Sequence, residues 1–131
     1  MGDFKKLVVW QKAHALAMHT DRVAAGIRRA HHKALRNQMV RAAMSIPANI
    51  VEGSGQESSR EFGRFLRYAI NSASELEYHL IAARDSGALP DVDTEPVSFQ
   101  LIEVRKMLHG LLRSVTPSHQ LAPPVRKTPK Q

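Results

Sequence analysis

The sequence predicts an all-α protein, an antiparallel up-down four-helix bundle with a disordered C-terminal tail. Apolar residues recur in steps of three and four along four stretches of the 131-residue chain, which is the spacing of one face of an α-helix. Glycines and prolines cluster between these stretches and near the C-terminus, and strand-like alternation is absent. Four short-linked amphipathic helices bury their apolar faces most simply against each other. An intermolecular coiled coil is the competing architecture, but the Pro and Gly stops argue against it.

The first helix is expected over residues 5–27 and the second over residues 33–53. The apolar face of the first helix comprises Val9, Ala13, Leu16, Thr20, Val23 and Ile27. The face of the second comprises Leu35, Met39, Ala43, Ile46 and Ile50. Pro47 lies inside this second pattern, and its missing backbone donor predicts a kink. The Gly-Ser-Gly segment at residues 53–55 predicts the end of the helix.

The third helix is expected to begin at a capping box of Ser58 with Glu61 and to end at Gly87. Its apolar face repeats in strict steps of three and four: Phe62, Leu66, Ala69, Ala73, Leu76, Leu80 and Ala83. The fourth helix is expected to take Thr94 as its N-cap. Its face comprises Val97, Leu101, Val104, Leu108, Leu111 and Val115. This 3.5-residue period is typical of the seams, the apolar lines along which neighbouring helices pack, of a left-handed bundle.

These helices predict one domain over residues 1–115, because a chain this short rarely builds two cores. Residues 116–131 are expected to form a flexible, basic, Pro-rich tail without apolar periodicity. The formal net charge is +7. Since Arg126, Lys127 and Lys130 belong to the tail, the predicted bundle carries only +4. The distribution of charge is therefore more informative than its total.

Composition and motifs narrow the possible functions. The chain has no cysteine, which excludes disulfides, zinc–thiolate sites and thiol nucleophiles. No apolar run reaches the roughly 20 residues that cross a bilayer, and the N-terminus lacks the apolar region of a signal peptide. Glu-x-x-His pairs, a Gly-x-Ser-x-Gly motif and a phosphate loop are absent from the sequence. We therefore expect a cytoplasmic protein with no membrane partner, no metal, no cofactor and no enzymatic activity.

Two groups of basic residues are candidate nucleic-acid contacts. Between Arg22 and Val51 the chain has no acidic residue. The bases of this stretch are Arg22, Arg28, Arg29, Lys33, Arg36 and Arg41. A second row, at i, i+4 and i+7 on the outer face of the third helix, comprises Arg60, Arg64 and Arg67. The acids cluster instead near the turn between the third and fourth helices, so we expect an electrically polar molecule: Asp85, Asp91, Asp93 and Glu95.

Arginine-rich surfaces suit phosphate backbones, through forked hydrogen bonds and the release of counterions. Pairing with acids of another subunit and simple solvation remain alternative explanations. Aromatic residues make up 5% of the chain, and none lies in the acid-free stretch. Backbone-directed contacts are therefore favoured over base stacking.

A polar motif in the second helix combines Pro47, Asn49, Glu52 and Gly53. Asn49 lies close to the apolar stripe, so its amide needs partners, and the carbonyl of Ala43 that Pro47 leaves without a donor is one candidate. Glu52 is expected to pair with an arginine of the third helix. The favoured interpretation is that Asn49 and Glu52 fix the kink and the packing register, and the alternative is a ligand-binding role.

Four segments together carry a family resemblance: DFKKLVVWQKA at residues 3–13, SIPANIVEGSG at 45–55, EFGRFLRYA at 61–69 and SELE at 74–77. Over residues 3–115 the chain resembles the bacterial four-helix-bundle proteins encoded within intervening sequences of large-subunit ribosomal RNA genes. It departs from the family pattern at Val51, where Ala is usual, and at Asn71, where Gly is usual. Gln56 stands where Arg is common, which removes one positive charge before the third helix.

The resemblance implies a small cytosolic bundle that assembles as a ring-shaped homopentamer. A distantly similar protein, the accessory variability determinant of diversity-generating retroelements, is basic and pentameric and binds nucleic acid and a reverse transcriptase. Most family members have no established biochemical activity, so the resemblance carries over no catalytic residue. The leading hypothesis is a non-enzymatic, homo-oligomeric protein that binds nucleic acid, with RNA favoured.

The second hypothesis is a structural or adaptor module that binds a protein partner through the assembled oligomer. This hypothesis rests on apolar residues beside the seams, which are more than the core of one bundle requires. The residues concerned are Leu7, Val8, Phe65, Ile70, Ile81 and Ile102.

Overall fold

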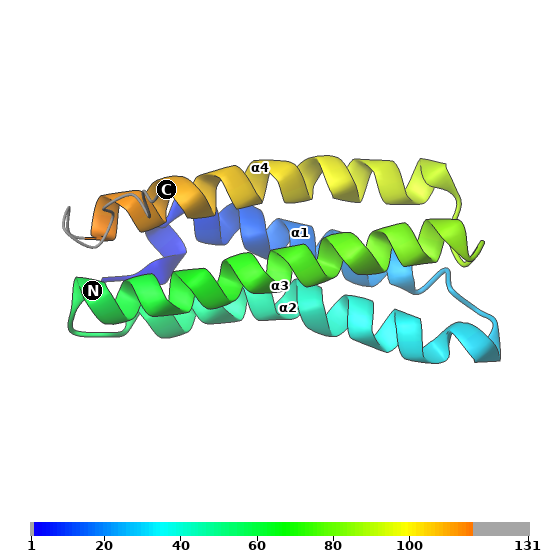
Figure 1. Cartoon of the computed structure of the whole chain (residues 1–131), viewed down its shortest axis with the longest axis horizontal. Coiled ribbons are helices and arrows are strands. Elements are labelled where there is room, and N and C mark those ends of the chain that lie inside the picture. The colour runs from blue at the N-terminus through cyan, green and yellow to red at the C-terminus, as the bar shows by residue number, and fades with distance from the viewer. Residues whose placement is uncertain (1, 117–131) are drawn as a thin grey trace, which may run out of the picture.

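The computed structural model describes residues 2–116, in which four α-helices run alternately up and down (Figure 1). Their bounds are Val8–Ala24 (α1), Lys33–Ser54 (α2), Ser59–Asp85 (α3) and Asp91–Val115 (α4), with short 3₁₀ turns at Phe4–Lys6 (η1) and Ala30–His32 (η2). Each helix packs against its neighbours in sequence, and α4 also packs against α1. The predicted four-helix bundle is therefore confirmed. The predicted tail, apart from Thr116, lies outside the described residues.

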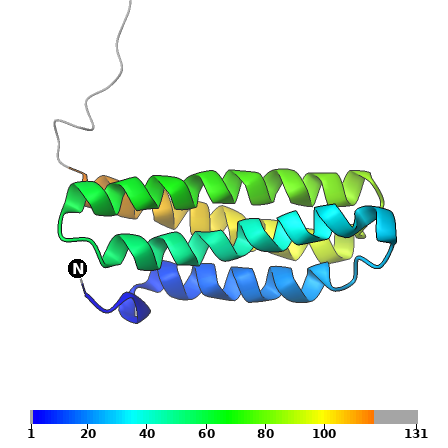
Figure 2. The same ribbon diagram turned by 90° about the horizontal axis from the view of Figure 1, so that it is seen from below.

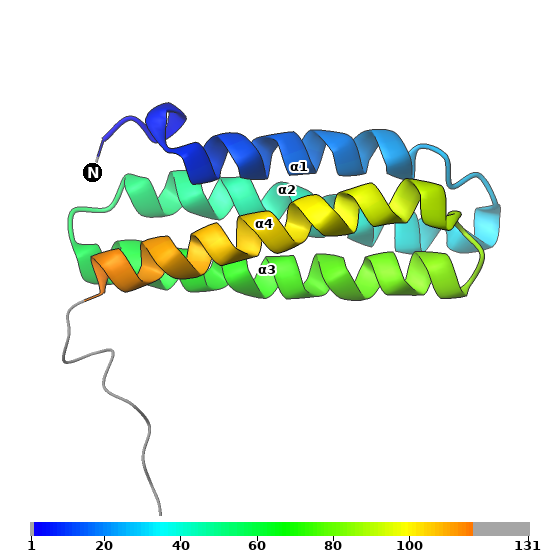
Figure 3. The same ribbon diagram turned by 90° about the horizontal axis from the view of Figure 1, so that it is seen from above.

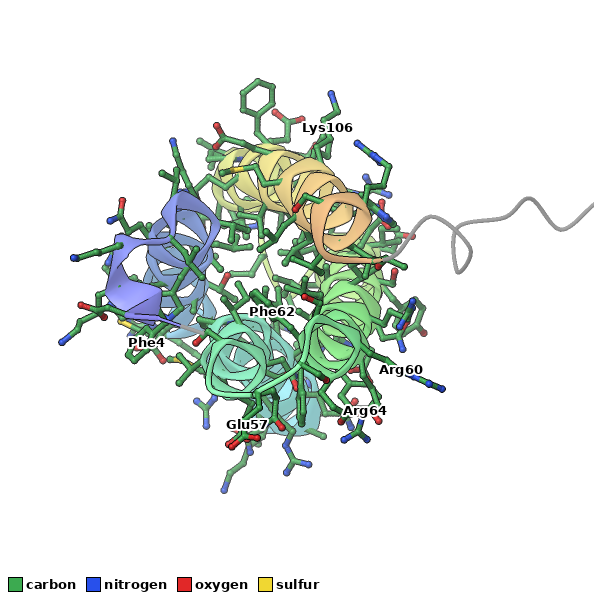
Figure 4. The ribbon with its side chains drawn as sticks, turned by 90° about the vertical axis from the view of Figure 1, so that its left-hand side faces the viewer. Phe4, Glu57, Arg60, Phe62, Arg64 and Lys106 are labelled. Carbon is green, nitrogen blue, oxygen red and sulfur yellow. The ribbon has the colours of Figure 1, made fainter. Side chains whose placement is uncertain are left out.

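The core lies along the axis that the four helices surround (Figure 4). All seven residues of the predicted α3 face are buried, as are Val97, Leu101, Val104 and Leu108 of α4. Leu111 and Val115 are only partly buried against this core, at the end of the bundle where α4 finishes. The sequence prediction of the α3 and α4 seams is thus confirmed.

Two helix starts differ from expectation. The first turn, η1, is separate from α1, because the Asp3 carboxylate accepts from the Lys5 backbone N–H at 3.0 Å and Leu7 is extended. Helix α4 begins at Asp91, three residues before the expected Thr94 N-cap. The Pro90 carbonyl already accepts from the Thr94 N–H at 3.2 Å, so Thr94 is buried within the first turn instead of capping it.

Two other predicted boundaries are confirmed. The Ser58 hydroxyl accepts from the Glu61 N–H at 3.1 Å at the start of α3. Gly87, in the turn after α3, has a φ of +77°, a left-handed conformation in which a side chain would be strained.

The up-down order places the α1–α2 connection and the α3–α4 turn at the same end of the bundle, as Figures 1 and 3 show. We call this the paired-turn end. The α2–α3 connection lies at the opposite end together with the N-terminus, as Figure 2 shows. Among residues 2–116, no helix is both long and apolar enough to span a membrane.

Candidate nucleic-acid interface

Basic side chains surround the α1–α2 connection at the paired-turn end. Arg22 closes the last turn of α1, and Arg28 and Arg29 follow in the connection. The acid-free stretch contains six predicted contacts: Arg22, Arg28, Arg29, Lys33, Arg36 and Arg41. Five of these side chains are exposed and Arg36 is half-buried. Within residues 2–116 none of the six forms an ion pair. Their charges therefore remain available to a partner.

These six residues do not share one face. Arg36 lines a surface hollow of about 430 Å³ between α1 and α2, where Asp21 supplies a carboxylate. Arg41 lies further along α2 and lines a different hollow, of about 300 Å³, with Glu75 and His79 of α3. The compact part of the basic group is therefore the connection and the first turn of α2.

Two histidines extend this basic group within η2. The rings of His31 and His32 lie 4.0 Å apart between centroids. Partial burial, and then the neighbouring His31 and Arg29, hold the pKa of His32 below its ordinary value of 6.5. His32 is therefore largely neutral at pH 7, and an anion bound nearby would favour its protonation.

The acidic residues lie at the same end of the bundle as these bases. Asp85 ends α3 and Asp91 begins α4, and the α3–α4 turn between them is beside the α1–α2 connection in Figure 1. The charge separation expected from the sequence thus runs across the paired-turn end, from the α1–α2 side to the α3–α4 side. A polyanion that approached this end would be attracted on one side and repelled on the other.

The second basic row lies at the opposite end, on the first turns of α3. Figure 4 shows Arg60 and Arg64 projecting outward from α3, and Arg67 is also exposed. Since α2 contains 22 residues, it separates the two ends by about 33 Å, at 1.5 Å per residue. The nine predicted contacts therefore do not form one surface that a short segment of RNA could cover.

Arg64 differs from its neighbours because its guanidinium is already bound. Its Nε and Nη2 donate to Glu61 Oε1 at 3.0 and 2.8 Å, and its Nη1 donates to the Tyr68 hydroxyl at 3.1 Å. The hydrogen bond to Glu61, and then the one to Tyr68, raise the pKa of Arg64. Arg64 also stacks over Phe65, with 5.0 Å between the guanidinium carbon and the ring centroid.

Sequence reasoning missed this aromatic cluster. The rings of Phe65 and Tyr68 meet edge to face, with 5.5 Å between centroids, and Tyr68 is 42% exposed. The absence of aromatics holds for residues 22–51 but not for the α3 row. The alternation of Arg and aromatic residues in RFLRY at 64–68 was the signal that could have revealed the cluster.

The polar motif of α2 joins this helix to α3. Helix α2 is unbroken through the buried Pro47. The Asn49 amide donates to the Ser45 carbonyl at 2.8 Å, not to the Ala43 carbonyl that Pro47 leaves free. The Ser45 hydroxyl in turn hydrogen-bonds the Ser72 hydroxyl of α3. This chain of contacts supports the register role proposed for Asn49.

The prediction that Glu52 pairs with an arginine of α3 is wrong. Glu52 is exposed and forms no ion pair among residues 2–116, and Arg64 instead binds Glu61 of its own helix. Gly53 has a structural role: a β-carbon there would lie 2.8 Å from Cδ1 of Phe62, so the absence of a side chain lets α3 approach α2. Within the described range, no three His, Asp or Glu side chains are grouped so as to hold a metal ion.

The architecture defines the class of small antiparallel four-helix bundles with exposed basic groups. Comparison narrows this class, because the family model described as 23S rRNA-intervening sequence protein matches residues 5–110. The chain belongs to this family.

A solved structure shares the fold. It is a protein with unknown function from the S23 ribosomal protein family of Bacteroides thetaiotaomicron, 23% identical, with a TM-score of 0.75. The match covers 81% of this chain and 99% of that one. No curated protein matches the chain.

Proposed function

We propose that this chain is a non-enzymatic, cytoplasmic RNA-binding protein that contacts the phosphate backbone through its paired-turn end. The observation that carries the proposal is the group of Arg28, Arg29 and Lys33. These side chains are exposed and lie within residues 28–33, in the α1–α2 connection and at the start of α2, with no ion-pair partner among the described residues. Unpaired guanidinium and ammonium groups of this kind neutralise phosphates and release counterions.

The absence of Phe, Tyr and Trp from residues 22–51 supports contacts with phosphate over contacts with bases. The α3 row supplies a separate and weaker surface, since of its three arginines Arg64 forms an ion pair, and Arg60 and Arg67 form none among residues 2–116. Because the acidic α3–α4 turn is close to the main group, we expect modest affinity that depends steeply on salt.

We further propose a homo-oligomer, with a pentameric ring favoured by the family resemblance. A ring would repeat the basic connection once per subunit, so that several weak contacts act together on one RNA. Linked sites of this kind exceed the affinity of one site without any new contact.

The alternative is an adaptor that binds a protein partner through the assembled oligomer. The exposed apolar side chains favour this alternative, among them Val8 at 54%, Ile81 at 42% and Ile102 at 49% exposed. Of the other residues predicted to supply such surface, Leu7, Phe65 and Ile70 are partly buried and contribute less.

The test is equilibrium binding of the purified chain to single-stranded RNA, duplex RNA and duplex DNA across a series of salt concentrations. We expect affinity for RNA that falls linearly with salt on logarithmic axes. Negligible binding at low salt, or binding indifferent to salt, would overturn the proposal. The protein absorbs weakly in the ultraviolet because it has one Trp and two Tyr, so co-purifying nucleic acid is visible in its absorbance ratio.

A further inference from the structure

Large apolar side chains stand exposed along the outer surface of α4. Phe99 is 80% exposed, Val92 is 75% exposed and Ile102 is 49% exposed. Phe99 and Ile102 also line a surface hollow of about 330 Å³ with Glu103 and Lys106. Figure 4 shows Lys106 projecting from α4 away from the core. A single exposed apolar residue needs no explanation, but a row of them on one helix face indicates a contact surface.

This row belongs to a second seam along α4. Steps of three and four join its exposed members: Val92, Glu95, Phe99, Ile102, Lys106 and His109. The inner seam of the same helix, which begins at Thr94 and Val97, faces the bundle core with the same period. A period of 3.5 residues keeps a stripe in register with a second helix. Helix α4 therefore carries one stripe for its own bundle and one that is unpartnered in the single chain.

The charges along the outer stripe fit a second copy of the same helix. The acid Glu95 lies toward the N-terminal end, the base Lys106 lies toward the C-terminal end, and apolar residues lie between them. An antiparallel copy of α4, related by a two-fold axis between residues 100 and 101, places Glu95 opposite Lys106 of the second copy. The same axis places Phe99 opposite Ile102 of the second copy, and each pair occurs twice. A parallel copy would instead place like charges side by side.

We propose that the outer stripe of α4 is a self-association surface on which a second copy of this chain docks antiparallel. On the side of this stripe that lies nearer α1, an ion pair between Lys12 and Glu103 joins α1 to α4, with 3.5 Å between Nζ and Oε2. A two-fold contact of this kind pairs two subunits and does not close a five-membered ring. It is therefore separate from any ring interface, and it pairs two chains or two rings whether or not RNA binds.

Charge reversal tests this geometry. Glu95 and Lys106 are eleven residues apart, about 16 Å along the helix, so they cannot pair within one chain. Glu95→Lys and Lys106→Glu should each weaken association at least tenfold, because each brings like charges together twice. The double variant Glu95→Lys/Lys106→Glu should restore association. An equimolar mixture of the two single variants should also associate, because their unlike stripes are complementary.

The readout is the molar mass of the full chain by sedimentation over a range of micromolar concentrations. The wild type should contain twice as many subunits as Phe99→Glu. Tyr78→Glu is the matched control, because Tyr78 is an aromatic residue 65% exposed on α3, and it should keep the wild-type mass. Equal masses of the wild type and Phe99→Glu would overturn the proposal. Failure of the double variant Glu95→Lys/Lys106→Glu to restore association would also overturn it. Circular dichroism confirms that each variant remains helical, and RNA affinity is measured separately.

Discussion

Gly53 of α2 and Phe62 of α3 are in such close contact that a β-carbon on Gly53 would lie 2.8 Å from Cδ1 of the Phe62 ring. The same β-carbon would lie 2.9 Å from Cβ of Phe65. A ring can rotate away, but Cβ of Phe65 is fixed to the α3 backbone. The last turn of α2 therefore requires glycine at position 53, because α3 packs closely against it there.

Gly53→Ala is expected to destabilise the protein by about 1–3 kcal/mol, the usual cost of overpacking a filled contact. The measurement is urea unfolding followed by circular dichroism. Gly55→Ala is the control, because a β-carbon at the exposed Gly55 would meet only backbone oxygens at 3.6 Å or more. Equal stability of the two variants would show that α3 does not depend on the close approach at Gly53.

Asn49→Asp is expected to cost about 1–3 kcal/mol at pH 7, because a carboxylate would replace the donor to the Ser45 carbonyl in a half-buried site. This environment raises the pKa of the new carboxyl in the folded state. The destabilisation is therefore full at neutral pH and disappears as the pH falls below the unfolded value of about 3.9. Unfolding of both proteins between pH 3 and 7 measures it, and a pH-independent difference would contradict the assigned donor.

Arg64→Ala and Arg67→Ala are expected to differ in their effect on RNA binding. Arg64 already donates to Glu61 and Tyr68, so its loss should leave the salt dependence almost unchanged. Arg67 has no ion pair among the described residues. Its loss should reduce the slope by about 0.7, one phosphate contact to a single strand. A larger change for Arg64→Ala would mean that RNA displaces Glu61.

His32 is expected to titrate below 6.5, and Arg29→Ala should move its pKa upward, because a nearby positive charge is removed. The shift should be partial, because burial is the larger cause. Since the folded pKa is depressed, the contribution of His32 to stability is present above about pH 6.5 and falls as the pH drops. Proton NMR of the histidine ring measures the midpoint. Bound RNA should raise this midpoint, and an RNA-saturated protein with an unchanged midpoint would place the phosphates elsewhere.

The sequence pattern predicted most of the core, because the spacing of apolar residues shows which face of each helix is buried. Leu66, Ala73 and Leu80 are buried as expected from their spacing. Helix starts were less predictable, since they depend on local capping. The N-cap of α4 is Pro90 instead of Thr94, and the Pro90 carbonyl accepts from backbone N–H groups of the first turn. Asp3 caps a separate turn before α1.

The candidate interface could be predicted only in part. The residue types and the acid-free stretch were visible in the sequence, but the pairing of Arg64 with Glu61 depends on side-chain geometry. The shared position of the basic and acidic turns follows from the up-down order and could have been inferred. The spacing of the outer stripe of α4 was also visible in the sequence, although of its three apolar members only Ile102 was predicted to supply exposed apolar surface.

Basic contacts at the paired-turn end are the central claim, and the salt dependence of RNA binding tests it most directly. The comparison is between the wild type and the variant Arg28→Ala/Arg29→Ala/Lys33→Ala, with helical content checked in both. Loss of up to three phosphate contacts should reduce the slope of log K against log salt by as much as about 2.1 for single-stranded RNA. An unchanged slope, with RNA still bound, would contradict the assignment of this end as the interface.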